Sequence, residues 1–226
     1  MDLPELYRGV LVKRYKRFLA DIETEDGVIT AHCPNTGSMT GCAEPGWTVW
    51  YSLSDNPKRK YAATWELVHT GRGICSVNTG RANYLVKEAI EQGVIAEVSG
   101  QEIKTEAKIP NGSGRFDLLV DTTYVEVKSV TLRMDDGHGE FPDAVSSRAL
   151  KHVRALEEVV ADGYRGVLMF CAQHTGIDTV RPAREIDPTY AQALGEALER
   201  GVEIYAYGID TDLKRISITQ PLPFKL

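Results

Sequence analysis

The sequence predicts an α/β protein of two units, a small β-barrel in residues 1–80 and an α/β domain in residues 81–226. Short apolar segments broken by Gly, Pro and Asn fill the first 80 residues, and none forms a convincing amphipathic helix. Beyond residue 80, strand-like and helix-like segments alternate, which is typical of a sheet covered by helices. Hydrophobic residues make up 42% of the 226 residues, enough for one large core or two small ones.

The first unit is expected to contain six short strands. Their candidate ranges are Tyr7–Val12, Phe18–Glu23, Val28–His32, Thr48–Ser52, Glu66–His69 and Ile74–Val77. Turn signals such as Glu25-Asp-Gly27 and Glu44-Pro-Gly46 separate them. Several short strands without a helix predict a small closed barrel. A five-stranded oligonucleotide-binding barrel fits the length, although periodicity does not distinguish it from other small barrels.

The second unit is expected to open with a helix at Tyr84–Gly93, which has apolar residues at 85, 86, 89 and 90 and a terminating glycine. Further helices are predicted at Asp143–Ala161, after a Pro-Asp start signal, and at Asp187–Arg200, which opens with Asp-Pro. The predicted strands are Val94–Val98, Glu102–Ala107, Phe116–Val120, Val125–Val130, Gly166–Phe170 and Val202–Tyr207.

The most informative segment is residues 115–129, where apolar and polar residues alternate on both sides of the turn 121–123. This period of two predicts a β-hairpin. Glu126 and Lys128 share one face of their strand, because side chains two apart point the same way. If Asp117 lies on that face, antiparallel pairing places it opposite either Glu126 or Lys128.

Two carboxylates beside an ammonium group are what metal-assisted phosphodiester hydrolysis requires. Mg²⁺ takes oxygen ligands, usually one or two carboxylates with water and substrate phosphate. A lysine beside it orients or helps to deprotonate the attacking water, or neutralises charge on the phosphorane. The competing interpretation is an exposed hairpin face with a cross-strand salt bridge, which is common and contributes little.

Composition narrows the function classes. The formal net charge of −6 argues against a generally basic nucleic-acid binder, yet residues 1–80 balance nine basic against nine acidic residues. Two basic groups stand out there as possible phosphate-binding patches, although solvated strand ends would explain them equally well. They are Lys13, Arg14, Lys16 and Arg17, and then Lys58, Arg59 and Lys60.

Cellular location is inferred from what the chain lacks. The four cysteines contain no C-x-x-C pair, no apolar run approaches the ~20 residues of a membrane span, and the first residues do not resemble a signal peptide. We therefore expect a cytoplasmic protein that does not bind membranes.

Further polar residues are candidate nucleic-acid contacts. Asn35 and Ser38 lie in a Gly-broken loop whose backbone and hydroxyl groups suit phosphates, although a structural turn is as compatible with the sequence. Arg148, Lys151 and His152 belong to one predicted helix, and 148 and 152 share a face. They are placed to hold a phosphate, whereas a histidine at such a position is more often at the surface or packed.

The order of these motifs resembles a known family. A helix with Glu88, then Asp117, then Glu126-Val-Lys128, is similar to the PD-(D/E)XK nuclease superfamily, with Phe116-Asp117 where the superfamily has Pro-Asp. Longer motifs along nearly the whole chain resemble the sugar fermentation stimulation protein A (SfsA) family. They are Phe18-Leu-Ala-Asp-Ile-Glu23, Cys33-Pro-Asn-Thr-Gly-Ser-Met-Thr-Gly-Cys42, Ser54-Asp-Asn-Pro-Lys-Arg-Lys60, Tyr124-Val-Glu-Val-Lys-Ser-Val-Thr-Leu132 and Phe141-Pro-Asp-Ala144.

The resemblance implies an N-terminal OB-fold-like barrel, a PD-(D/E)XK nuclease-like domain with a mixed central sheet, and an association with DNA. It also implies that Asp117 and Glu126 are ligands of Mg²⁺ or Mn²⁺, that Lys128 is the active-site lysine and that Glu88 is an acid supplied by the helix. The carbonyl of Val127, which lies between two site residues, is a further candidate ligand.

Two functions are compatible with these observations. The first is a metal-dependent nuclease that binds nucleic acid, expected to be DNA, through the barrel and its basic groups. The second is a non-catalytic DNA-binding regulator of sugar metabolism genes that retains a nuclease fold. The complete set of Glu88, Asp117, Glu126 and Lys128 favours the enzyme, because carboxylates without a metal repel phosphate.

Overall fold

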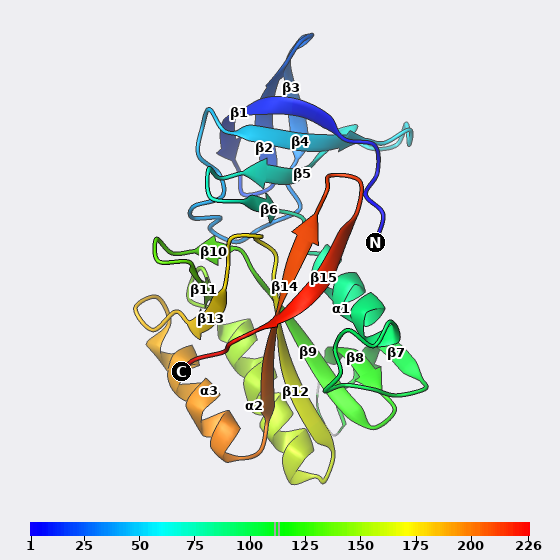
Figure 1. Ribbon diagram of the computed structural model, residues 1–226, viewed down its shortest axis with the longest axis vertical. Coiled ribbons are helices and arrows are strands. Elements are labelled where there is room, and N and C mark those ends of the chain that lie inside the picture. The colour runs from blue at the N-terminus through cyan, green and yellow to red at the C-terminus, as the bar shows by residue number, and fades with distance from the viewer. Residues whose placement is uncertain (111, 113) are drawn as a thin grey trace.

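A computed structural model of the protein describes residues 1–110, 112 and 114–226. The chain forms an OB-like barrel followed by an α/β domain, which lie at the top and bottom of Figure 1. No helix among the described residues is long and apolar enough to cross a membrane.

The barrel consists of antiparallel strands that close on themselves. Its elements are β1 (Tyr7–Tyr15), β2 (Leu19–Thr24), β3 (Gly27–His32), β4 (Thr48–Leu53), β5 (Ala63–His69) and β6 (Ile74–Ser76), in the order β3-β2-β1-β4-β5-β6. A parallel bridge between His32 of β3 and Thr64 of β5 closes β1–β5 into a five-stranded barrel. Trp65 is fully buried inside it and donates to the carbonyl oxygen of Leu67 at 3.0 Å.

The α/β domain is built on a mixed sheet, as predicted, and this sheet has six strands. Its strands are β7 (Ile103–Lys108), β8 (Arg115–Val120), β9 (Thr123–Val130), β12 (Arg165–Ala172), β14 (Glu203–Thr211) and β15 (Ile216–Leu222), in the order β15-β14-β12-β9-β8-β7. The central strands β9, β12 and β14 are parallel, and the outer pairs are antiparallel.

Helices cover both faces of this sheet (Figure 1). Leu168 and Phe170 of β12 join the core beneath α2 (Ser147–Ala161) and α3 (Pro188–Glu199), whereas Val167 and Met169 join the core beneath α1 (Arg81–Glu91). The alternation along β12 follows from the period of two of a strand that is buried on both faces.

Several predicted boundaries were wrong. Residues 94–98 form no strand, because Ile95 and Val98 are buried as a loop against α1, where the amide of Ile95 donates to the Ala89 carbonyl. Helix α2 begins at Ser147 and not at Asp143, since Ser146 accepts the Ala149 amide as the N-cap.

A small sheet was not predicted from the sequence. Strands β10 (Leu132–Arg133), β11 (His138–Phe141) and β13 (Thr179–Pro182) pair in the order β10-β11-β13. They are too short for a two-residue alternation to be recognised. Strand β15 was missed as well, because Pro221 and three polar or exposed positions interrupt its apolar pattern.

Candidate metal and phosphate site

Asp117 and Glu126 lie at the point where the β8–β9 hairpin opens. The hairpin turns at Asp121 and Thr122, and its last pair is Leu118 with Val125. The next residues along the two strands are Asp117 and Glu126, so the register places these carboxylates opposite each other. Of the two pairings that the sequence allowed, this is the one that brings the two candidate metal ligands together.

Two hydrogen bonds hold the Asp117 carboxylate. Its Oδ1 accepts from the Asn83 side chain of α1 at 2.7 Å, and its Oδ2 accepts from the Val127 amide, also at 2.7 Å. Burial raises the pKa of Asp117 to about 6, and the nearby Glu126 adds to this effect, whereas the amide of Val127 and the ammonium of Lys128 oppose it. A cation bound beside Asp117 would therefore stabilise its ionised form, which burial disfavours.

Glu126 is more deeply buried, with 3% of its side chain exposed. Its Oε1 accepts from Lys128 Nζ at 2.6 Å and also contacts His152 Nδ1 on α2. Burial by itself would raise the pKa of Glu126, but the hydrogen bonds and charges of His152 and Lys128 outweigh it and hold the pKa below its ordinary value. Within the described residues the other oxygen, Oε2, is buried without a hydrogen-bond partner.

Glu88 is not placed where the sequence predicted it. Its carboxylate pairs with the N-terminal ammonium of Met1 at 2.6 Å and lies 3.7 Å from the guanidinium of Arg215. The α1 side chain that reaches Asp117 is Asn83, which the sequence analysis placed before the helix. The helix in fact begins at Arg81, and a residue five positions from Glu88 does not share its face.

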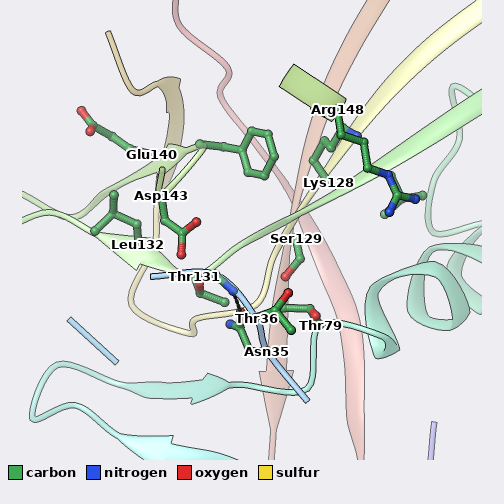
Figure 2. A pocket seen from close by; sticks show the side chains of 13 residues that line it. Asn35, Thr36, Thr79, Lys128, Ser129, Thr131, Leu132, Glu140, Asp143 and Arg148 are labelled. Carbon is green, nitrogen blue, oxygen red and sulfur yellow. Dashed lines mark hydrogen bonds between the residues drawn. The ribbon is translucent and has the colours of Figure 1, made fainter. Parts of the chain in front are cut away.

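A cavity of about 330 Å³ adjoins this cluster, between the barrel and the α/β domain. Figure 2 shows Asn35 and Thr36 of the loop after β3 on one side of it and Lys128 on the other, and Ser129 and Thr131 also line the cavity. Arg148 of α2 also lines it. The candidate loop and the candidate helix therefore meet at one cavity, although the sequence separates them by more than a hundred residues.

Comparisons with known proteins agree with this architecture. The family model described as "SfsA N-terminal OB domain" matches residues 12–77, and the one described as "Sugar fermentation stimulation protein RE domain" matches residues 80–215. The chain belongs to the SfsA family.

Relatives cover nearly the whole chain. A sugar fermentation stimulation protein homolog of Shewanella loihica is 50% identical over 232 residues, covering 99% of both chains. One of Shewanella piezotolerans is 50% identical over 231 residues, covering 99% of this chain and 98% of the relative. The structure of Pyrococcus furiosus SfsA in complex with Ca²⁺ superposes with a TM-score of 0.90 at 25% identity, covering 100% of this chain and 98% of that one.

The SfsA site of this chain has the donor set for a divalent cation. Asp117 and Glu126 provide two carboxylates, and Mg²⁺ usually takes one or two from a protein; within the described part of the chain one oxygen of Glu126 has no hydrogen-bond partner. No group of three or more His, Cys, Asp or Glu side chains arranged to hold a metal occurs in the described part of the chain. A cation here would therefore complete its shell with water, phosphate or backbone oxygen, and the carbonyl of Val127 remains a predicted ligand.

The α2 candidates differ in their surroundings. His152 contacts Glu126, and its Nδ1 also lies 3.5 Å from Lys128 Nζ, so it takes part in the carboxylate cluster. Arg148 is exposed at the cavity, one turn earlier on the same helix. Lys151 is exposed on another face of the helix, as its spacing requires.

The basic residues of β1 and its turn are not equivalent. The guanidinium of Arg14 donates to the carbonyl oxygens of Asn35, Gly37 and Ser38 at 2.8–3.1 Å, and Arg17 Nε donates to that of Thr36 at 3.1 Å. Arg14 thus supports the loop beside the cavity through its Nη1 and Nη2 atoms, and its role as a phosphate contact stays a prediction.

The remaining basic candidates are exposed. Lys13 lies 3.5 Å from Asp21 and Lys16 is exposed in the turn after β1, whereas Arg59 donates to Thr64 at 2.9 Å from the loop that joins β4 to β5. Lys58 is exposed on the same loop, and Lys60 lies over the Tyr61 ring. These lysines stay predicted nucleic-acid contacts.

Proposed function

We propose that this protein is a divalent-metal-dependent phosphodiesterase that acts on nucleic acid, with DNA as the first substrate to test. The observation that carries the proposal is the convergence of Asp117, Glu126 and Lys128 at one buried cluster, in which Glu126 Oε2 has no hydrogen-bond partner among the residues that the structure describes. A buried carboxylate oxygen without a hydrogen bond is costly, and a bound cation would remove that cost.

The proposed cofactor is Mg²⁺ or Mn²⁺, held by Asp117 and Glu126. When bound, the metal ion would supply charge stabilisation at a phosphate and lower the pKa of a coordinated water. The Ca²⁺ complex of Pyrococcus furiosus SfsA supports divalent-metal binding at some site of this fold. Ca²⁺ prefers oxygen ligands, as Mg²⁺ does, and both carboxylates fit that preference.

The chain's own residues have separate tasks in this proposal. Asn83 and the Val127 amide hold Asp117 in one orientation. Lys128 compensates the buried charge of Glu126 and offers an ammonium group on the side of the cavity, where a phosphate oxygen would enter. Arg148 lies at the same cavity and suits a second phosphate oxygen.

The test is hydrolysis of end-labelled single- and double-stranded DNA and RNA in Mg²⁺ or Mn²⁺. We expect cleavage by the wild type and loss to background in Asp117→Asn, Glu126→Gln and Lys128→Met. The matched control is Asp26→Asn, an exposed carboxylate in the β2–β3 turn, which should cleave as the wild type does. Absence of cleavage on all four substrates, or full activity in Asp117→Asn, would reject the proposal.

The second candidate is a DNA-binding regulator that does not cleave. The pairing of Glu88 with Met1 and Arg215 favours it, because the helix-borne acid that the superfamily resemblance implied is engaged elsewhere. In that case DNA affinity should fall with salt, and replacing Lys58 and Lys60 should weaken it while Asp117→Asn should not.

A further inference from the structure

The loop after β3 bridges the two units of the protein. We call residues 34–40 the roof segment. At its start, the hydroxyl of Thr79 donates to the carbonyl oxygen of Pro34 at 3.3 Å. At its end, Ser38 Oγ donates to the carbonyl oxygen of Asp143 at 2.8 Å, and the amide of Met39 donates to Asp143 Oδ2 at 3.1 Å. The roof segment is therefore anchored at its start by the residues that lead into α1 and at its end by the loop before α2.

The roof segment is also held firmly from the barrel side. Arg14 and Arg17 bind its carbonyl oxygens, as described above, and Asn35 Oδ1 accepts the amide of Gly37 at 2.8 Å. A Cβ atom added to Gly37 would lie 2.5 Å from Asp143 Oδ2, so this part of the roof packs directly on the α/β domain. Lifting the segment would require several of these bonds to break together.

The cavity of about 330 Å³ lies beneath the roof segment, with Lys128 and Arg148 on its other side (Figure 2). A second cavity, of about 270 Å³, lies on the α1 side and is lined by Asn83, Tyr84 and Asp117. The carboxylate–lysine cluster separates the two, because Asp117 faces one cavity and Lys128 the other. Thr79 lines the first cavity and its neighbour Gly80 lines the second.

The second cavity offers a surface for a base. The Tyr84 side chain lines this cavity and is 65% exposed. An exposed aromatic ring beside a candidate phosphate site suits stacking on an unpaired base. Lys87 lines the same cavity but forms an ion pair with Glu91. We therefore expect this cavity to bind nucleic acid by stacking on Tyr84 more than by charge.

We propose that the substrate is a single strand of nucleic acid that enters by a free end beneath the roof segment. The inference rests on the proposed function and deepens it. Both cavities lie near or below the low end of the volumes typical of ligand pockets, which suits a single chain beneath the roof segment. A roof tied on both sides admits a strand by its end, whereas a circular strand has no end to pass beneath it.

The first experiment measures binding and not cleavage. Fluorescence anisotropy is recorded in Ca²⁺ for a labelled linear single-stranded DNA, its ligated circle and a blunt hairpin duplex of equal length, with intact DNA verified on a gel. We expect the linear strand to bind at least tenfold more tightly than the circle and the duplex. Equal affinities, or no binding of any of the three, would overturn the inference.

Variants of Asp143 test the role of the roof segment. Asp143→Ala removes the acceptor for Met39, one of the bonds that hold the roof segment, so discrimination between linear and circular DNA should decrease. Asp143→Asn removes the same charge but keeps an acceptor oxygen, and should keep the discrimination. If both variants change the ratio of the affinities for linear and circular DNA equally, the charge of Asp143 and not the roof segment determines that ratio, and the inference is wrong. Denaturant unfolding of each variant checks that it is folded.

Tyr84 provides an independent readout. Tyr84→Ala should weaken the linear strand by about 5- to 150-fold, the range of one lost base–aromatic stack, whereas Tyr84→Phe should bind as the wild type does. Unchanged binding in Tyr84→Ala would show that no base stacks on Tyr84. Binding of linear strands without any cleavage in Mg²⁺ or Mn²⁺ would reject the nuclease function and leave the entry mode standing. Cleavage of circles and duplexes at the same rate as linear strands would support the nuclease function and reject entry by a free end.

Discussion

Asn83 donates a 2.7 Å hydrogen bond to Oδ1 of Asp117, and so connects helix α1 to the candidate metal ligand on β8. The second oxygen of Asp117 is bound by the Val127 amide, so the carboxylate is held at both ends. This support was not visible in the sequence, where an asparagine before a helix is most simply a cap.

Replacing Asn83 by Ala should weaken metal binding without removing a metal ligand. Loss of a residue that orients a ligand typically costs 10–100-fold in metal affinity or activity, and we expect an effect in that range. Isothermal titration with Mn²⁺ measures it. Lys87→Ala is the matched control, because it lies one turn along the same helix and pairs with Glu91; equal losses in the two variants would contradict the assignment.

Glu66 and Arg81 form a buried ion pair at 2.7 Å, with side chains 5% and 11% exposed, which joins β5 to the first residue of α1. Ser52 and Asn78 donate further hydrogen bonds to the Glu66 carboxylate. Glu66→Ala leaves the Arg81 charge buried and should lower the free energy of unfolding by about 3–5 kcal/mol. Urea unfolding tests this, and Glu23→Ala, an exposed glutamate of the barrel, should stay within about 0.5 kcal/mol of the wild type.

Arg14 should matter for stability more than for charge. Arg14→Ala removes the donors to the carbonyls of Asn35, Gly37 and Ser38, and should lower the free energy of unfolding by about 2 kcal/mol. Lys58→Ala removes the same charge from an exposed loop and should have little effect in the same urea titration. A cost for Arg14→Ala no larger than that for Lys58→Ala would show that the hydrogen bonds are not stabilising.

His174 should make the protein less stable in mild acid. It is 1% exposed, its Nδ1 accepts the amide of Gly176, and its Nε2 therefore carries the proton toward Thr70 Oγ1. Burial, with a contribution from the Arg133 charge, lowers its pKa to about 4 from 6.5. The unfolded chain then binds the proton more readily, so stability is full above pH 6.5 and falls as pH decreases toward 4.

The expected loss from His174 between pH 7 and pH 5 is about 2 kcal/mol. Urea unfolding at the two pH values measures it against His174→Gln, which keeps a donor toward Thr70 but does not titrate. The variant should lose less stability on acidification than the wild type. A variant that lost as much would assign the pH dependence to other groups.

The sequence predicted the fold well where apolar periodicity was long, and the site only in part. The hairpin around Asp117 and Glu126 follows from an alternation that survives in both strands. The start of α1 is shifted three residues earlier than predicted, which adds a first turn where Asn83 reaches Asp117, whereas Glu88 pairs with Met1. Such a shift leaves the apolar stripe intact and is invisible to periodicity.

Long-range contacts account for the other features that the sequence did not predict. Asp143 was read as a helix start because Pro-Asp is a common one, yet its carboxylate accepts the amide of Met39 across the two units. Arg14 looked like part of a basic patch because local sequence does not reveal that a loop twenty residues later turns its carbonyls inward. Both features depend on partners that only the folded chain brings together.

Because the Glu66–Arg81 ion pair joins the barrel to the first residue of α1, the number of residues between Arg81 and Asn83 determines whether Asn83 reaches Asp117. Arg81 lies two residues before Asn83, so the barrel fixes the rotation of the helix that supports Asp117. One residue inserted within that first turn would rotate the following positions by about 100° and carry Asn83 away from the carboxylate. We therefore expect an insertion between Arg81 and Asn83 to weaken metal binding far more than an insertion of equal length in the β2–β3 turn. The spacing between these two residues is thus part of the geometry of the site.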